Sequence, residues 1–568
     1  MLFIKKLKIH NYRCYRDFSI SFNPHMNIIV GNNEAGKSTI LEAVNLAFSG
    51  LVNGKNVHNE FSESYINKAA VHDYINEIKK GEKNIPPEVV IEVYLGSYDG
   101  NDEDAHYIAA LNGIYNSDGD IHASGFKFIM SFNEELYGDE YNLLLETMEA
   151  SSFDSVPIEY YDISWRDFSD NPIAPRSIPF KTALIDSTNR VGNENTYLNY
   201  IVKDALERGD VNSITQAHRH LRDVFKNDEA VNRINNKINH SGKLTNKEIT
   251  LAVEVITKNA WISTLVAELD EVPFAFLGQG EQSIVKTELA LNRKKSLNAG
   301  AVLIEEPENH LSHTNLNRLL NQISEGYPDK QFIVTTHNSF VANKLGLGNI
   351  LLLNQQGGQH QILRLSDLSS ETQRFFKQIS GYDTLRLLLC DKIVLCEGDS
   401  DELVIQKYYK QENGKLPIED GIEVISVGTS FLRFIEVADK LHCKISVVTD
   451  NDGDVEARKR KYSDYVDNEG KMKKENVKIC MDWAVHNETE FSGGEKFLDS
   501  AFNLNTLEPE MLLSNHLSDL NDIFGKRYED DYAMLKFMHA NKTECALCIF
   551  NTDKVVVFPE YIREAFEW

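Results

Sequence analysis

The chain lacks the features of a secreted or membrane protein. Its 568 residues contain no apolar run long enough to cross a bilayer, and lysines interrupt the short apolar stretches of MLFIKKLKIHNYR, which argues against a signal peptide. Cysteine is scarce, with seven residues, and only Cys545 and Cys548 form a CxxC pair, whereas a zinc ribbon needs two such pairs. We therefore expect a cytoplasmic protein with reduced structural thiols and no membrane contact.

The chain also lacks the basic excess that is usual in nucleic-acid-binding proteins. It has 59 lysine and arginine residues against 86 aspartate and glutamate residues, a net charge of −27. If the chain binds DNA, the contact is confined to a local patch, and bound metal ions would cancel part of the acidic charge. Internal repeats and sustained heptads are absent, so long coiled-coil arms are not expected.

A phosphate-binding loop is the first motif. GNNEAGKS (31–38) stands between the strand-like MNIIVG and the helix-like TILEAVNLAFSG, which is the order such a loop requires. Gly36 would let backbone N–H groups approach the phosphates, Lys37 would reach the β- and γ-phosphates, and Ser38 would bind Mg²⁺. The sequence therefore predicts an ATP site. Its expected residues are Gly31, Asn32, Asn33, Gly36, Lys37, Ser38 and Thr39.

Three downstream motifs complete this ATPase pattern. The apolar strand 301–304 ends in Glu305, which we expect to hold Mg²⁺, and Glu306, which we expect to polarise the attacking water. Two merely solvated glutamates would explain neither the apolar run before them nor the PENHLS turn after them. FIVTTHNS places His337 after another buried strand, as a γ-phosphate sensor would lie. In FLGQGEQSIVKTELAL, two glycines precede a helix.

This order of motifs resembles the ABC ATPases of the SMC, RecF and Rad50 group. NYRCYRDFSISF is similar to their N-terminal strand pair, and LGQGEQ resembles a degenerate form of their signature loop. The resemblance implies a head dimer, because the signature loop of one subunit closes on ATP held by the other. The chain has Glu305 where aspartate is common and has no LSGGQ, so we expect slow hydrolysis.

A second group of carboxylates follows two later strands. In DKIVLCEGDSDE, an apolar strand ends at Glu397, and Asp401 and Glu402 fall in the next helical turn. In KISVVTDNDGD, a similar strand delivers Asp450 and Asp452. Because the carboxyl ends of parallel strands meet at one edge of a sheet, these carboxylates are expected to converge. Clustered oxygen ligands favour Mg²⁺ or Mn²⁺.

Two alternatives apply to this acidic loop and the basic run behind it. DNDGD could be an ordinary acidic turn; an EF-hand is disfavoured, because a strand precedes the loop and its twelfth residue is Lys461. The basic run could grip phosphates or form an ordinary solvated face. It comprises Arg458, Lys459, Arg460 and Lys461, followed by Lys471, Lys473 and Lys474.

The strand ending in EG(x)₂(D/E), followed by a strand ending in DxD, resembles the Toprim domain of topoisomerases, primases and nucleases. Behind an ABC head, this domain is similar to the OLD family of ATP-linked nucleases, which includes the Gabija nuclease subunit and some retron effectors. The resemblance implies an α/β fold, with an ABC-type head carrying a helical dimerisation insertion and a C-terminal Toprim domain of parallel sheet flanked by helices. It covers nearly the whole chain, most weakly in 100–270.

The resemblance also implies roles for individual residues. VHNETEF is similar to the third acidic element of the family, with Glu490 as the best match, and NKTECAL resembles its late lysine motif, with Lys542 stabilising phosphate charge. Asp401 stands where glutamate is usual, so Glu402 could share its role. The implied Toprim metal ligands are Glu397, Asp401, Asp450, Asp452 and Glu490. The implied catalytic residues are Glu306, Glu397, Asp450, Asp452 and Lys542.

We therefore predict an ATP-binding, Mg²⁺-dependent DNA endonuclease under the control of an ABC head, active in antiphage defence. Its expected partners are DNA, a second copy of the chain, and a neighbour-encoded helicase or retron reverse transcriptase. One alternative is a topoisomerase-like enzyme using Tyr462 or Tyr465, and another is a non-cutting ATP-sensing scaffold. The expected domains are 1–193 and 266–365 (ATPase halves), 194–265 (helical insertion), 366–388 (connector) and 389–568 (Toprim).

Overall fold

The chain forms two compact units in the computed structural model. The first comprises 1–337 with 353–362, and the second comprises 338–352 with 363–568. The structure describes all residues except 32–34, 53–54, 82–83, 99–105, 107, 148–152, 179, 187–205, 207, 241–249, 252–260, 262–265, 267, 292–298, 310, 357–358, 365–367, 379–389, 391, 442, 468, 494 and 499–501. About half of the predicted connector lies outside the described residues, and the predicted domain boundaries stay predictions.

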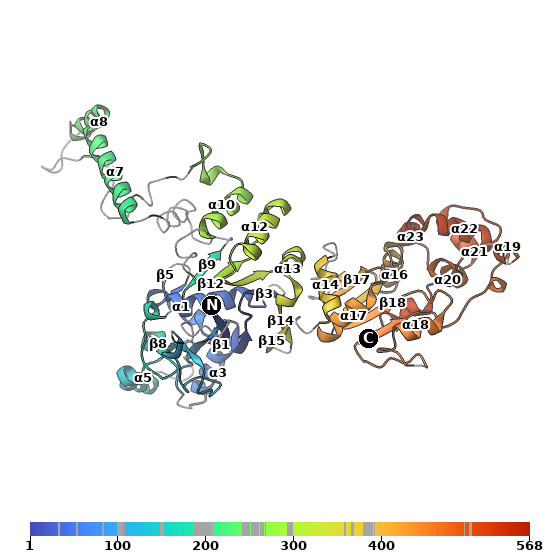
Figure 1. Cartoon of the computed structure of the whole chain (residues 1–568), viewed down its shortest axis with the longest axis horizontal. Coiled ribbons are helices and arrows are strands. Elements are labelled where there is room, and N and C mark those ends of the chain that lie inside the picture. The colour runs from blue at the N-terminus through green and yellow to red at the C-terminus, as the bar shows by residue number, and fades with distance from the viewer. Residues whose placement is uncertain are drawn as a thin grey trace. The chain divides into compact units, whose positions relative to one another are not determined.

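The first unit contains a six-stranded sheet whose central strands are parallel and buried (Figure 1). Its strands are β3 (Met26–Gly31), β9 (Thr182–Asp186), β12 (Ala301–Glu305), β13 (Gln331–Thr336), β14 (Ile350–Gln356) and β15 (Gln359–Arg364). The order is β15-β14-β3-β13-β12-β9, with β3, β13, β12 and β9 parallel. Every residue of β13 is buried, as expected for a sheet that is covered on both faces.

A five-stranded antiparallel sheet accompanies it. Its strands are β1 (Leu2–Tyr12), β2 (Tyr15–Ser21), β6 (Val89–Ser97), β7 (Ser124–Phe132) and β8 (Tyr161–Asp167), in the order β2-β1-β6-β7-β8. Helix α1 (Lys37–Ser49) contacts β9 and β12 of the first sheet and β6 of the second. Because α1 starts soon after β3, the predicted phosphate-binding loop lies at the carboxyl edge of the parallel sheet.

The remaining elements of this unit include one strongly amphipathic helix pair. They are α2 (Val57–Glu60), α3 (Lys68–Lys79), α5 (Glu134–Thr147), α7 (Arg208–Asn227), α8 (Glu229–His240), α10 (Gln279–Leu291), α12 (His313–Glu325), and the short strands β4 (Leu51–Val52), β5 (Lys55–Asn56), β10 (Glu268–Leu269) and β11 (Val272–Pro273). On α7, Leu221, Val224 and Phe225 are 57%, 55% and 40% exposed. Their spacing places them on one face of the helix. Both α7 and α8 lie in the described part of the predicted insertion 194–265.

The second unit is built on a four-stranded parallel sheet. Its strands are β16 (Lys392–Cys396), β17 (Ile422–Ser426), β18 (Lys444–Val448) and β19 (Val477–Cys480), in the order β17-β16-β18-β19. Its helices are α13 (Ser339–Leu345), α14 (Ser370–Gln378), α16 (Asp399–Asn413), α17 (Phe431–Leu441), α18 (Val455–Lys461), α19 (Glu495–Leu498), α20 (Leu507–Ser514), α21 (Leu517–Phe524), α22 (Asp531–Ala540), α23 (Lys542–Asn551) and α24 (Glu560–Glu564).

The late helices of this unit pack against α16 and the sheet. Helix α23 runs in contact with α16, and residues of α20, α22, α23 and α24 share one apolar core with β16 and α16. The predicted α/β class, with a parallel sheet flanked by helices, is confirmed. Within the described residues, no helix combines the length and the apolar character that a membrane span requires.

Candidate active site and nucleotide site

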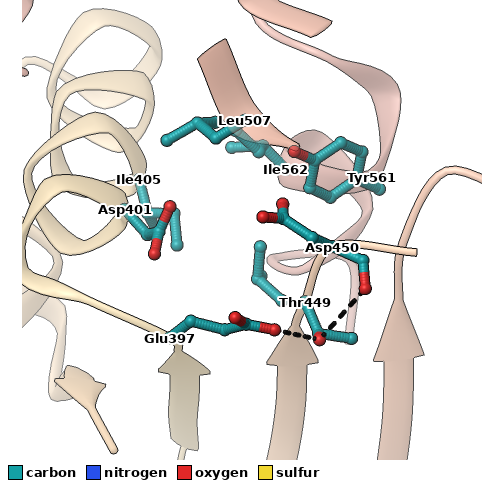
Figure 2. A pocket seen from close by; sticks show the side chains of 9 residues that line it. Glu397, Asp401, Ile405, Thr449, Asp450, Leu507, Tyr561 and Ile562 are labelled. Atoms are coloured by element: carbon teal, nitrogen blue, oxygen red, sulfur yellow. Dashed lines mark hydrogen bonds between the residues drawn. The ribbon is translucent and has the colours of Figure 1, made fainter. Parts of the chain in front are cut away.

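Three carboxylates meet at the carboxyl edge of the parallel sheet in the second unit. Glu397 follows β16, Asp450 follows β18, and Asp401 lies in the first turn of α16. Figure 2 shows these three side chains around one space, with the Asp450 carboxylate directed toward Asp401. The residues that line this pocket are Glu397, Asp401, Ile405, Val448, Thr449, Asp450, Leu507, Tyr561 and Ile562. The structure thus brings together three of the predicted metal ligands.

Hydrogen bonds fix the direction of two of these carboxylates. The Thr449 hydroxyl donates to Glu397 Oε1 at 2.6 Å, as the dashed line in Figure 2 shows. The Gly398 N–H donates to Asp401 Oδ2 at 2.8 Å, which also caps the start of α16. Both side chains are therefore oriented by the protein itself, which is a requirement for a precise binding site.

Burial and mutual repulsion change the acidity of this group. Burial, with the charges of Asp401 and Glu397, raises the pKa of Asp450 to about 9. Burial, with the charges of Glu508 and Glu397, raises the pKa of Asp401 to about 6, although the Gly398 N–H opposes this rise. Ionising the whole group is unfavourable unless a cation is present. Because carboxylate oxygens are the donors that Mg²⁺ and Mn²⁺ prefer, the residues fit a divalent ion.

Helix α20 places two further carboxylates near this group, and the sequence analysis did not identify them. Glu508 is 7% exposed, and its Oε1 lies 2.8 Å from Lys542 Nζ. Glu510 is 3% exposed, and in the described part of the chain neither of its oxygens has a hydrogen-bond partner. Burial raises the pKa of Glu510 to about 7, although the nearby Tyr561 hydroxyl opposes this rise. The only sequence signal is a pair of charges inside the apolar segment LEPEML.

Lys542, the predicted phosphate-binding lysine, lies beside these carboxylates at the start of α23. Burial acts to lower the pKa of Lys542, but the hydrogen bond and charge of Glu508 raise it overall, with Asp450 and Asp401 contributing. A permanently charged lysine is therefore held next to the acidic pocket. Its contact with phosphate stays a prediction.

Asp452 and Glu402 lie outside the pocket lining. Asp452 forms an ion pair with Arg458, and Asn503 Nδ2 donates to its Oδ1 at 3.0 Å. Glu402 accepts a hydrogen bond from Gln406 Nε2 at 3.0 Å. The motif predicted that these two carboxylates follow the strands of the parallel sheet. In the structure, however, their side chains contact Arg458, Asn503 and Gln406 and do not line the pocket. Their metal-binding roles stay predictions.

Glu490 also lies outside this lining and stabilises a turn. Its Oε2 lies 2.7 Å from His486 Nδ1, and its Oε1 accepts the Asn487 N–H at 2.9 Å. On the other side of the ring, His486 Nε2 lies 2.9 Å from Asp482 Oδ2. Burial acts to lower the pKa of His486, but hydrogen bonds to the two carboxylates raise it overall. Whether Glu490 holds a metal ion stays a prediction.

In the first unit, the phosphate-binding loop is closely surrounded where it enters α1. Gly36 has a left-handed backbone with φ 95°, and a Cβ atom there would lie 2.4 Å from the Tyr15 hydroxyl and 2.8 Å from Cys14 Sγ. A larger residue cannot occupy this position without moving its neighbours. The predicted Asn32 and Asn33 lie outside the described residues.

Lys37 is folded back onto the loop. It is 6% exposed, and its Nζ donates to the Gly31 carbonyl at 2.8 Å. Burial lowers the pKa of Lys37, and the three glutamates at and after the end of β12 oppose this shift. Ser38 and Thr39 follow in the first turn of α1. A strand that ends at Gly31 and a helix that starts at Lys37 thus flank the loop, as phosphate binding requires.

The carboxylates after β12 lie next to His337. Glu305 ends the strand, and Glu306 takes a left-handed backbone with φ 42°. His337 Nδ1 lies 3.3 Å from Glu306 Oε1 and 3.5 Å from Glu308 Oε1. Glu308 also accepts the His337 N–H at 3.2 Å. The sequence pattern predicts only a turn at Glu308, whereas in the structure its side chain is 6% exposed and lies beside the predicted sensor His337.

The raised pKa of Asp450 predicts how the metal-free protein responds to pH. An aspartate in an unfolded chain has a pKa of about 3.9, whereas that of Asp450 is about 9 in the folded chain. Between these values the folded state binds more protons than the unfolded state, so stability falls as pH rises. We expect the melting temperature in EDTA to fall from about pH 6 to about pH 8, and Asp450→Asn to flatten this slope. Equal slopes for both proteins in differential scanning calorimetry would contradict the assignment.

Family comparisons match ATPase domains to the N-terminal part of the chain and a Toprim domain to the second unit. Residues 6–148 match a family model described as an AAA domain, and residues 156–343 match a second AAA domain, whose description names the AbiEii toxin of type IV toxin–antitoxin systems. Residues 388–452 match the TOPRIM domain of proteins like the overcoming lysogenization defect protein. The Toprim match contains the ends of both strands that deliver Glu397 and Asp450.

Relatives with curated names match only short stretches. The Rad50 ATPase of Archaeoglobus fulgidus is 49% identical over 51 residues, which are 9% of this chain and 6% of that protein. RecF of Alkaliphilus oremlandii is 30% identical over 97 residues, 17% of this chain and 24% of that protein. The chain therefore spans less than two thirds of these relatives. Among solved structures, the SMC head domain from Thermotoga maritima has 14% identity and a TM-score of 0.30, covering 64% of this chain and 98% of that chain.

Proposed function

We propose that this chain, which joins an ATPase head to an OLD-like Toprim domain as an OLD-family nuclease does, is a divalent-metal-dependent DNA endonuclease controlled by ATP. The observation that supports this most strongly is the convergence of Glu397, Asp401 and Asp450 on one pocket, with Lys542 beside it. When bound there, divalent cations would stabilise the charge that develops on a phosphodiester during hydrolysis.

Residues in the pocket would bind the metal ions, and residues beside it would bind the substrate. Glu397, Asp401 and Asp450 would hold the cations, because their oxygens face one space. Lys542 would contact a phosphate oxygen as a point charge. Glu508 would set the position of that lysine through the 2.8 Å ion pair. This arrangement would bind DNA through the charge of its phosphodiester backbone and would not recognise the base sequence.

Asp452 and Glu490 remain proposed metal ligands, provided that each can leave its present partner. Each is already bound to a cation or to a ring nitrogen, Asp452 to Arg458 and Glu490 to His486. For either carboxylate to reach a metal ion, its present pair would have to open. A metal ion competes well for a carboxylate at an exposed ion pair, because such pairs contribute little to stability.

In the head, the proposed site binds ATP on the loop before α1. Lys37 would turn from the Gly31 carbonyl to the β- and γ-phosphates, and Ser38 with Glu305 would hold Mg²⁺. Glu306 would polarise water, and His337 would contact the γ-phosphate. We propose that ATP binding in the head controls cleavage in the Toprim domain.

The direct test is cleavage of supercoiled plasmid by the purified full chain. We expect nicked or linear product with Mg²⁺ or Mn²⁺ and none with EDTA, and a change in rate when ATP is added. Intact plasmid under every condition would favour the non-cutting scaffold. A tyrosine-linked DNA adduct would favour the topoisomerase-like alternative, for which Tyr465 is the more accessible candidate because Tyr462 is only 1% exposed.

The biological setting that we propose is antiphage defence, with a neighbour-encoded helicase or reverse transcriptase as partner. The support is the OLD-like Toprim match, since the resembled family contains defence nucleases. Phage plating on cells that carry the native gene neighbourhood tests this. Equal plating with wild-type chain and with Glu397→Gln would argue against a role for cleavage in defence.

We also propose that the chain is a homodimer and that α7 contributes to the contact. The apolar face of Leu221, Val224 and Phe225 is exposed in the single chain, and an exposed apolar stripe of this kind marks association surfaces. We expect Leu221→Glu with Val224→Glu to shift the protein toward monomer by light scattering. Arg222→Ala, on the polar face of the same helix, is the matched control. A dimer unchanged in the double variant would exclude this face.

A further inference from the structure

An exposed tryptophan lies in the loop after β19, at the edge of the sheet that carries the pocket. Trp483 is 37% exposed and its neighbour Val485 is 53% exposed. The chain has four tryptophans, and Trp165, Trp261 and Trp568 are all less exposed. An exposed tryptophan ring offers a flat apolar surface on which a nucleic-acid base can stack.

The position of Trp483 relative to the pocket is fixed by Asn451. This asparagine is fully buried, and its Nδ2 donates to the carbonyls of Asp482 at 2.8 Å and Ala484 at 2.7 Å, the residues on either side of the tryptophan. Asn451 directly follows Asp450 in the chain. The backbone that carries the exposed ring is therefore tied to the loop that delivers the pocket carboxylate.

One lysine lies near the ring. Lys459 Nζ of α18 lies 6.0 Å from the ring centre of Trp483. On another side, Gly470 packs against the ring, where a Cβ would lie 3.5 Å from ring atoms. Lys459 pairs with Glu456, which is 73% exposed, and Lys471 pairs with Glu469 with both side chains about three quarters exposed. The Lys471–Glu469 pair is exposed and contributes little to stability, whereas the Lys459 side chain is 21% exposed and only its partner is exposed. An incoming anion would draw either lysine from its glutamate.

We propose that Trp483 stacks on an unpaired base of the DNA strand bound at the Toprim site, while Lys459 contacts a neighbouring phosphate. This inference rests on the proposed nuclease function and names its substrate class as single-stranded, frayed or branched DNA. Every base has a face that stacks on an aromatic ring, so the contact tolerates any sequence. In a chain with a net charge of −27, a stacking contact supplies affinity that does not depend on charge.

The test measures binding in EDTA and low salt, so that no cleavage occurs. Fluorescence anisotropy with a labelled oligo(dT) should show about tenfold weaker binding for Trp483→Ala than for wild type. Trp483→Phe should retain most of the affinity, because phenylalanine also stacks. Tyr115→Ala, which removes another exposed aromatic ring (57% exposed), is the matched control and should bind as wild type does. In wild type, oligo(dT) should quench tryptophan emission, and Trp483→Phe should remove that quenching.

Besides normal oligo(dT) binding by Trp483→Ala, two results would overturn the inference. One is an abasic oligonucleotide of the same length that binds as tightly as oligo(dT), since it keeps the phosphates and lacks the bases. The other is an equal loss of affinity for oligo(dT) and for paired duplex in Trp483→Ala. The plasmid test is separate: if wild type cuts plasmid with Mg²⁺ but Trp483→Ala binds oligo(dT) normally, only this inference fails. If wild type cuts no DNA at all, the proposed nuclease function fails.

Discussion

Asp450→Asn is expected to reduce metal-dependent plasmid cleavage by at least about 100-fold, which is more than the loss usually seen for residues that only orient metal ligands. Asparagine keeps the size of the side chain but cannot ionise to the carboxylate that would hold a cation beside Asp401 and Glu397. Folding should be retained, because the variant removes a carboxyl group whose ionisation is opposed by burial and by the charges of Asp401 and Glu397. Cleavage assays, melting curves and ATP affinity on one preparation measure all three effects.

The matched control is Glu412→Gln, an exposed carboxylate toward the other end of α16. It removes one negative charge from the same unit without touching the pocket, so cleavage should be unchanged. ATP affinity should match wild type in both variants, because neither alters the head. Full cleavage by Asp450→Asn would place the active site elsewhere in the chain or show that a contaminating nuclease was measured.

Lys37→Ala and Glu306→Gln should separate ATP binding from ATP hydrolysis. Loss of Lys37 removes a hydrogen bond to charged phosphate, which contributes roughly 1.5–3 kcal/mol, so we expect ATP affinity to fall about 10- to 100-fold. Glu306→Gln keeps the shape of the side chain beside His337 and removes the base, so ATP should still bind while hydrolysis falls by about 100-fold or more.

Lys79→Ala is the control for the head, because it removes an exposed lysine whose partner Asp154 is also exposed. ATP affinity and hydrolysis should both be unchanged. Nucleotide affinity is measured by isothermal titration calorimetry and hydrolysis by phosphate release. If both site variants lose affinity equally, Glu306 has been assigned the wrong role, and Glu308, the buried neighbour of His337, becomes the better choice for the base.

Local sequence signals predicted the parts of both sites that stand at strand ends. GNNEAGKS, Glu305 and Glu397 each stand at or directly after the end of an apolar strand, and the carboxyl edge of a parallel sheet then brings such positions together. For this reason Glu397 and Asp450 could be expected to share a pocket. The structure also brings His337 and Glu306 together, which follow the neighbouring parallel strands β13 and β12.

The rest depends on tertiary packing that no local pattern contains. Glu508 and Glu510 reach the pocket region because α20 packs against the sheet, and their segment LEPEML is simply an apolar stretch with two charges. The motif gave the identity of Asp452 and Glu490, but side-chain direction depends on Arg458 and His486, which compete for them. The spacing of a motif predicts the position of a carboxylate along the chain. It does not predict which side chain that carboxylate contacts.

The late helices bear on when the pocket forms during synthesis. Tyr561 and Ile562 of α24 line the same pocket as Glu397, so residues at distant positions in the chain must meet before it is closed. Chains fold domain by domain as they leave the ribosome. The sheet of the second unit is therefore synthesised well before its pocket can close, and a nascent chain that lacks α24 would hold its carboxylates in a space still open to water. The pocket is therefore complete only after α24 has left the ribosome and packed against the rest of the unit.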